Sequence, residues 1–283
     1  MQSTSLFVDD LTVIDFSYLH PTRGLLGESW IVDVELLGEL DDKGFIFDFS
    51  LVKQKIKSVL DELIDHTLLV PKFYKDLNFT IEENRINLIY KCKSGKIEMK
   101  APLSAVYLAD VSEITIPTVT PLLEKEILKN LPDNVLDVKL NLHTEKIDTP
   151  FYHYSHGLKK HDGNCQRIAH GHRSKIEIYI NGDLSKKWMS YWTDKFADIY
   201  IASSEDVIRM NDDNISFEYR SLQGDFSLTI PSSRCYIINT ETTVEEIARH
   251  IGKIIHEKQE ADHIIVRAFE GVKKGSIVRY ESS

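Results

Sequence analysis

The sequence predicts an α+β protein that contains two copies of one unit. The segment Gly27–Leu40 matches the segment Gly171–Leu184, and both alternate apolar and polar residues as half-buried strands do. A second pair of segments, which begin at Ile86 and Ile215, aligns without gaps. Because both matches occur in the same order, we interpret the chain as a tandem repeat. We place the first unit at residues 1–148 and the second at residues 149–283.

Each copy contains a predicted β-hairpin followed by a helix. Short polar steps ending in glycine, Lys93–Gly95 and Leu222–Gly224, predict the hairpin turns. We expect Thr120 to cap the first of these helices, with Pro121 at its first position. Thr243 begins a capping box at the second.

The first copy carries an additional amphipathic helix that the second replaces with an unrelated sequence. Ser50 is the expected cap, and Val52, Ile56 and Leu60 lie on its apolar face. An Asp-His pair, Asp65 and His66, follows just past the helix end, and the second copy has no such pair.

Composition excludes several classes of protein. The chain has 283 residues and a net charge of −10, without a long basic run, so we expect neither a nucleic-acid nor a membrane partner. No apolar run approaches the roughly 20 residues that span a bilayer, and the N-terminus lacks the pattern of a secretory leader. Three unevenly spaced cysteines do not form a disulfide framework, which indicates a cytoplasmic protein.

Histidines gather at the start of the predicted strand of the second copy. His170 and His172 are separated from the isoleucines of that strand by even numbers of residues, so their side chains lie on the same, inward face. Such a pair is typical of half a zinc site, and His156 is the candidate third ligand, with His153 and His161 as competitors. Hydrogen-bonded core histidines are the alternative. Burial of two imidazoles without a metal or a charged partner is costly, which favours the metal.

Cys165 precedes these histidines within a polar stretch that does not suit a core residue. Near a metal cation the pKa of its thiol should fall, which would make it a base or a nucleophile. It could equally be a fourth metal ligand. Cys92 and Cys235 are interpreted as apolar filler.

Together these motifs resemble the 6-pyruvoyltetrahydropterin synthase family, which includes the 6-carboxytetrahydropterin synthase of queuosine biosynthesis. The resemblance identifies His156, His170 and His172 as zinc ligands and Cys165 as the catalytic cysteine. It identifies Glu270 as the residue that anchors the pterin substrate.

The first copy supplies what the second lacks. Asp65 and His66 match the family pair that activates the cysteine, whereas Leu26-Gly27-Glu28 stands where the two zinc-binding histidines would be. The resemblance therefore implies no zinc in the first unit, although it retains His20. We expect a site shared between the two units, within one chain or between neighbouring chains.

The resemblance implies two tandem tunnelling-fold units, each with a four-stranded antiparallel sheet and two helices on one face. Such units join edge to edge, so a homo-oligomer is expected. The implied activity is that of a zinc-dependent carbon-oxygen or carbon-carbon lyase acting on 7,8-dihydroneopterin triphosphate or a related pterin. The spacing of Cys165 and His170 is intermediate between the carboxy-type and pyruvoyl-type enzymes, so the product stays open. The alternatives are a member that binds a pterin or purine without turnover and, more weakly, an unrelated zinc hydrolase.

Overall fold

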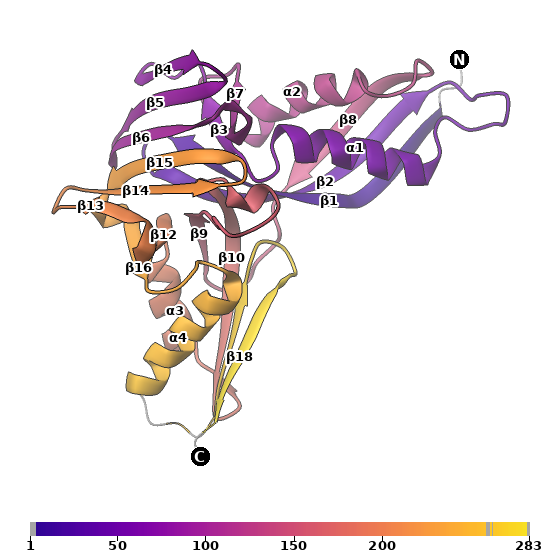
Figure 1. The fold of residues 1–283 in the computed structure, drawn as a ribbon. Coiled ribbons are helices and arrows are strands. Elements are labelled where there is room, and N and C mark those ends of the chain that lie inside the picture. The colour runs from indigo at the N-terminus through magenta and orange to yellow at the C-terminus, as the bar shows by residue number, and fades with distance from the viewer. Residues whose placement is uncertain (1–3, 259–260, 262, 282–283) are drawn as a thin grey trace.

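The computed structural model describes residues 4–258, 261 and 263–281, and it shows two α+β units and a shared third sheet (Figure 1). The sheet of the first unit has the strand order β7-β3-β1-β2-β8. Two helices lie on one face of this sheet (Figure 1). The elements of this unit are β1 (Thr4–His20), β2 (Gly24–Gly38), α1 (Phe49–Leu63), β3 (Leu68–Pro71), β7 (Val106–Ala109), α2 (Ile116–Leu128) and β8 (Val135–His143).

The second unit repeats this arrangement with the strand order β16-β12-β9-β10-β17-β18. Two helices again cover one face, and their apolar side chains pack with Ile176 and Ile178 of β10 in one core. The elements of this unit are β9 (Phe151–His156), β10 (His170–Ile180), β11 (Asp183–Leu184), α3 (Lys186–Lys195), β12 (Ile199–Ser203), β16 (Cys235–Ile238), α4 (Val244–Lys258), β17 (His263–Phe269) and β18 (Gly275–Glu281).

The prediction of two tandem units with helices on one face is confirmed, and the sheets differ from the expectation in two details. The long strands are antiparallel as predicted, but the short strands β3, β7, β12 and β16 add in parallel. In the described part of the first unit only three long strands pair, since the chain passes from β8 directly to β9. The fourth antiparallel strand is present in the second unit alone, as β18.

The two predicted hairpins merge into one six-stranded sheet with the order β13-β14-β15-β6-β5-β4. Strands β6 and β15, one from each unit, pair antiparallel at its centre. Apolar side chains of both units, among them Met99 and Leu228, form a common core beneath it. The elements are β4 (Leu77–Glu82), β5 (Arg85–Cys92), β6 (Gly95–Pro102), β13 (Val207–Met210), β14 (Asn214–Ser221) and β15 (Gly224–Pro231).

Two of the three predicted helix caps are wrong. Helix α2 begins at Ile116, where Thr115 and Thr118 form a capping box, so that Pro121 lies inside the helix. Helix α1 is capped by Asp48, whose carboxylate accepts from the main chain of Ser50. The cap of α4 is confirmed, because the Oγ1 of Thr243 accepts from the backbone N–H three residues further on.

The two units touch where β2 crosses β10, at a pair of glycines. A Cβ on Gly27 would lie 1.9 Å from the Tyr154 carbonyl oxygen and 2.4 Å from the backbone nitrogen of His172. A Cβ on Gly171 would lie 2.6 Å from the Cα of Gly27. Beside this contact the hydroxyls of Ser17 and Ser155 share a buried hydrogen bond of 2.7 Å. The backbones therefore approach as closely as glycine permits.

Replacement of Gly27 should disrupt this crossing. In Gly27→Ala the new methyl group meets backbone atoms that cannot rotate away, so we expect the free energy of unfolding to fall by about 1–3 kcal/mol or more. Denaturant unfolding measures the change. Gly44→Asn is the control, because nothing lies within 4 Å of its Cβ position and asparagine tolerates the positive φ there. Equal stability of Gly27→Ala and the unsubstituted protein would contradict the close contact.

Candidate active site at the junction of the two units

Three histidines of the second unit meet in the protein interior. His156 and His170 are direct partners across β9 and β10, and His172 follows two residues along the same strand. All three are at most 1% exposed. One ring nitrogen from each lies within 4.8 Å of the others. The three Nε2 atoms are buried and have no hydrogen-bonding partner among the described residues. Three convergent, unpaired nitrogens form a donor set that suits a tetrahedral metal with one open position.

The opposite ring nitrogens fix the tautomers of two of these histidines. The Nδ1 of His156 lies 2.8 Å from the Thr242 carbonyl oxygen, and the Nδ1 of His170 lies 3.2 Å from that of Arg167. Since a carbonyl oxygen only accepts, each Nδ1 must carry the proton, and each Nε2 keeps its lone pair. Burial lowers the pKa of both imidazoles well below the usual value, so they remain neutral.

The two competing histidines lie outside this group. The Nδ1 of His153 lies 2.8 Å from the carbonyl oxygen of Gly27, and burial lowers its pKa to about 4. His161 belongs to the loop after β9, where its Nδ1 accepts from the backbone N–H of Gly163. Both side chains therefore have local hydrogen-bonding roles.

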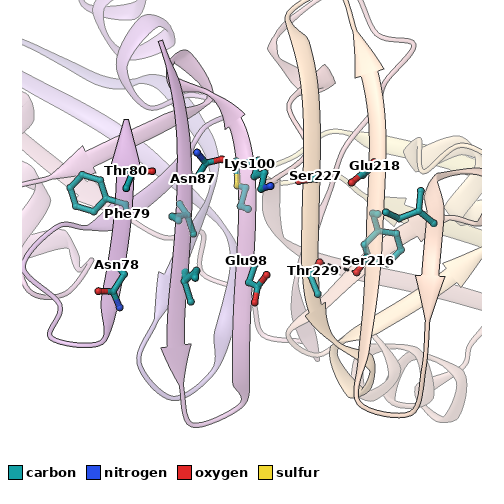
Figure 2. Close-up of a pocket in the computed structure, with 15 residues that line it drawn as sticks. Asn78, Phe79, Thr80, Asn87, Glu98, Lys100, Ser216, Glu218, Ser227 and Thr229 are labelled. Carbon is teal, nitrogen blue, oxygen red and sulfur yellow. Dashed lines mark hydrogen bonds between the residues drawn. The ribbon is translucent and has the colours of Figure 1, made fainter. Parts of the chain in front are cut away.

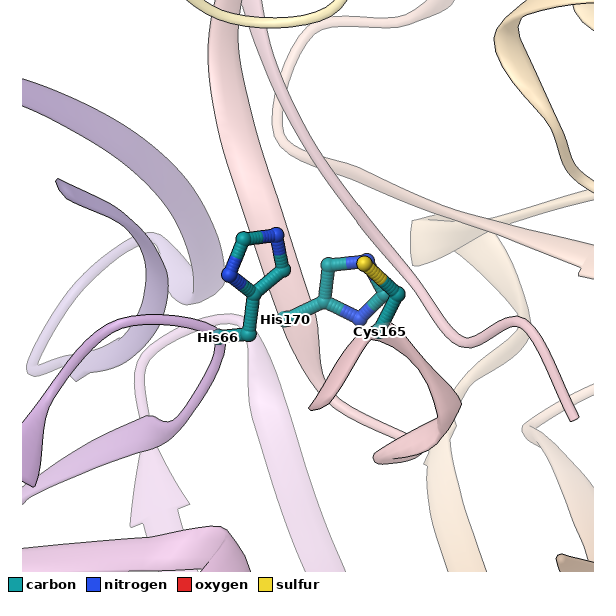
Figure 3. A group of neighbouring side chains, drawn as sticks. All are labelled: His66, Cys165 and His170. Atoms are coloured by element: carbon teal, nitrogen blue, oxygen red, sulfur yellow. The ribbon is translucent and has the colours of Figure 1, made fainter. Parts of the chain in front are cut away.

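Cys165 lies in a short turn, Asn164–Gln166, between β9 and β10, and it faces His66 of the first unit (Figure 3). The Cys165 sulfur and ring nitrogens of His66 and His170 lie within 4.8 Å of one another. Cys165 does not join the group of three histidines, so the geometry favours a role beside the metal site over that of a fourth ligand.

Asp65 and His66 follow the end of α1 and reach this turn in the same chain. The His66 Nδ1 lies 2.7 Å from the Asp65 Oδ2. Burial alone would lower the pKa of His66, but hydrogen bonds to Asp65 and Cys165 outweigh it and raise this pKa to about 10. An imidazolium at this position stabilises a neighbouring thiolate. The His66 backbone has a φ of 55°, a conformation rare for residues other than glycine.

Glu270 also reaches the site, from the turn between β17 and β18. Its Oε1 lies 3.9 Å from the Nε2 of His172, and its backbone N–H bonds to the Lys274 carbonyl across the turn. The side chain is about one quarter exposed, so its carboxylate can meet a ligand that enters from solvent.

Asp15 of β1 is a member of the site that the motifs do not indicate. This carboxylate is 2% exposed, and its Oδ1 lies 3.2 Å from the Nδ1 of His172. Lys274 and the hydroxyl of Ser29 also contact it. The sequence offers one signal for Asp15, which is an acidic residue within an otherwise apolar strand segment. This signal does not indicate that the carboxylate contacts His172.

The corresponding place in the first unit lacks the three clustered histidines. The β1–β2 register pairs Leu26 with Tyr18, just as the β9–β10 register pairs His170 with His156. Tyr18 therefore occupies the position of the first ligand, and the inference that His20 is retained there is wrong. His20 lies two residues further on, where its Nδ1 accepts hydrogen bonds from the turn.

This counterpart place is occupied by other polar contacts. Glu28 stands where His172 does, and burial raises its pKa to about 7. Asp198 follows α3 with a φ of 58°, as His66 follows α1, and it binds the Arg23 guanidinium through both oxygens. No group of three potential metal ligands gathers there among the described residues; a separate group, Asp10, Asp33 and His143, lies elsewhere on the surface.

Two of the surface hollows differ in their distance from the site. One of about 580 Å³ lies between α1 and the Cys165 turn and is lined by Asn164 and Arg167 of that turn and its end. The other, of about 520 Å³, lies over the six-stranded sheet and contains none of the site residues (Figure 2).

Comparison with known proteins gives the family. The family model for 6-pyruvoyl tetrahydropterin synthase matches residues 13–119 and 148–282, one segment in each unit. The chain belongs to this family.

Its relatives include a candidate 6-carboxy-5,6,7,8-tetrahydropterin synthase of Methanocaldococcus jannaschii, 33% identical over 117 residues that cover 40% of this chain and 69% of the relative. A protein of Pyrococcus abyssi with the same description is 26% identical over 47% of this chain and 77% of its own length. Among solved structures, 6-pyruvoyl tetrahydropterin synthase of Plasmodium vivax is 18% identical, with a TM-score of 0.41 over 53% of this chain and 95% of its own. No helix in the described ranges is long and apolar enough to cross a membrane.

Proposed function

We propose that this protein is a zinc-dependent lyase of the 6-pyruvoyl- or 6-carboxytetrahydropterin synthase type, acting on 7,8-dihydroneopterin triphosphate or a related pterin. The observation that carries the proposal is the set of three unpaired Nε2 atoms beside the Cys165–His66 contact. Family membership and the names of the archaeal relatives support the pterin substrate. They give no support to an unrelated zinc hydrolase.

The three histidines would hold zinc through Nε2, with the tautomers of His156 and His170 fixed by main-chain carbonyls. Zinc supplies a Lewis acid that polarises a side-chain oxygen of the substrate and so acidifies the adjacent C–H. Glu270 would accept hydrogen bonds from the amino group and ring N–H of the pterin, which suits a carboxylate with two oxygens.

We expect about one zinc per chain, bound at the second-unit site, because Leu26 and Glu28 replace two ligands in the first unit. Elemental analysis of the purified protein measures this ratio. The double variant His170→Ala/His172→Ala should lose the metal. Asp110→Asn is the matched control, since it alters an exposed carboxylate that pairs with Lys72 and belongs to no group of potential metal ligands among the described residues. Its metal content should be unchanged. Two zinc ions per chain would contradict the assignment.

Cys165 would act as the base. Its thiolate, stabilised by the protonated ring of His66, would take the proton from the substrate carbon, and Asp65 would hold the ring in place through Nδ1. The proton is then held on the Cys165 sulfur, because the protonated ring of His66 has no free nitrogen that could accept it.

Product analysis with 7,8-dihydroneopterin triphosphate tests both the activity and this role. We expect the zinc-loaded protein to form a tetrahydropterin product, and the side chain left on that product separates the carboxy-type from the pyruvoyl-type reaction. Cys165→Ala should retain zinc and pterin binding but lose turnover by roughly a hundredfold or more. Cys235→Ala is the control, because burial raises the pKa of that thiol to about 12 and keeps it inert. Pterin binding without any product would instead support a non-catalytic family member.

The site should work within one chain. His66→Ala should reduce turnover strongly and leave the zinc content unchanged, because His66 faces the thiol and is not one of the three proposed ligands. Mixing inactive His66→Ala chains with inactive Cys165→Ala chains should restore no activity, since both groups of each site come from the same chain. Recovered activity would show that the site is shared between chains.

We also propose that the chain forms a homo-oligomer. The outer edges of β8 and β18 have no pairing strand within the described residues, and such edges are commonly covered by another copy. The molar mass in solution, measured before the mixing experiment, checks this.

A further inference from the structure

Asp15 is an acidic residue of the first unit that contacts a proposed metal ligand of the second. The carboxylate lies at the crossing of the two units and is almost completely buried. Its Oδ1 lies 3.2 Å from the His172 Nδ1 and 2.5 Å from the Ser29 Oγ, and its Oδ2 lies 2.9 Å from the Lys274 Nζ. A buried carboxylate without partners is costly, so these three contacts account for its presence there.

The partner of His172 differs from those of the other two histidines. The Nδ1 atoms of His156 and His170 face main-chain carbonyls of their own unit. The Nδ1 of His172 has no such hydrogen bond, and the group next to it is the Asp15 carboxylate from the other unit. A carboxylate accepts the Nδ1 proton as a carbonyl does, and its charge also makes the opposite nitrogen a better donor to a metal.

The backbone of Asp15 also holds the Asp-His pair. Its N–H donates to the Asp65 Oδ1 at 2.8 Å, and its carbonyl accepts from the His66 N–H at 2.7 Å. Asp15 therefore contacts the proposed zinc ligand His172 through its side chain and the Asp65–His66 pair through its main chain.

We propose that Asp15 is a positioning residue. It orients His172 for metal binding, and it sets the distance between His172 and the Asp65–His66 pair. The proposal rests on the zinc site put forward above. The carboxylate selects the tautomer of His172 with the proton on Nδ1, which leaves the Nε2 lone pair directed at the metal. The second unit thus depends on the first for the arrangement of its own ligand set.

Zinc affinity, measured by competition with a chelator and without substrate, tests this role. Asp15→Asn removes the charge while keeping the shape, and we expect zinc to bind about 10- to 100-fold more weakly. In the cobalt-substituted protein the visible absorption bands should shift, because the ligand field of His172 changes. The control is Asp206→Asn, which removes the charge of another buried carboxylate, 2.6 Å from the Lys159 Nζ and outside the groups of potential metal ligands among the described residues. It should bind zinc like the unsubstituted protein.

The melting temperature of the metal-free protein shows whether Asp15→Asn folds. If it does not fold, a second variant tests the same role. Ser29→Ala removes the hydroxyl that holds the carboxylate and should weaken zinc binding to a smaller extent, with the same direction of spectral shift. Affinities within twofold of the unsubstituted protein for every folded variant would overturn the proposal. The zinc affinities are measured without substrate, so a failed lyase assay would not contradict the role of Asp15. An unsubstituted protein that binds no zinc would contradict both the role of Asp15 and the proposed zinc-dependent lyase.

Discussion

The close approach of the backbones at Gly27 and Gly171 is the constraint on which the site depends. With no side chain between them, β2 and β10 cross in direct contact, and the residues on either side of the crossing face each other. Asp15, Asp65 and His66 of the first unit are thereby brought to the three clustered histidines of the second, the proposed metal ligands. The polar groups that meet there are buried, and the ring nitrogens without a hydrogen-bonding partner among the described residues are the three Nε2 atoms and the Nδ1 of His172.

The two units have diverged in complementary ways around this crossing. One side keeps the histidines, Cys165 and Glu270, while the opposite side has Leu26 and Glu28 at the ligand positions. The Arg23–Asp198 pair occupies the place where an Asp-His pair would serve a second site. A buried charge without a partner destabilises a fold. In the first unit, the Arg23–Asp198 ion pair and the apolar side chain of Leu26 stand where the second unit has its cluster of polar groups.

The sequence was sufficient for the parts of this structure that depend on local pattern. Alternating strands, the two glycine turns and the inward pair of His170 and His172 follow from period and spacing, whereas His156 and Cys165 were singled out from their alternatives by the family resemblance. The role of Asp15 could not be predicted, because its meaning comes from a contact with a residue far along the chain. His20 was misplaced for a related reason: only the strand register shows that Tyr18 is opposite Leu26. The cap of α2 was wrong because Thr115 competes with Thr120 for the same role, and the tertiary packing of Val119 and Leu123 decides between them.

The six-stranded sheet has a mechanical consequence for the site. The contact at Gly27 and Gly171, with the polar contacts beside it, joins the two units at one place, and a rotation of the units about this place would carry Asp15 away from His172. The pairing of β6 with β15 joins the units again at a second place, through hydrogen bonds and a common apolar core. Because the units are joined both at the glycine crossing and at the β6–β15 pair, one unit cannot rotate freely relative to the other. The hairpins, which contribute no residue to the chemistry, therefore act as a brace that keeps the distances inside the site constant.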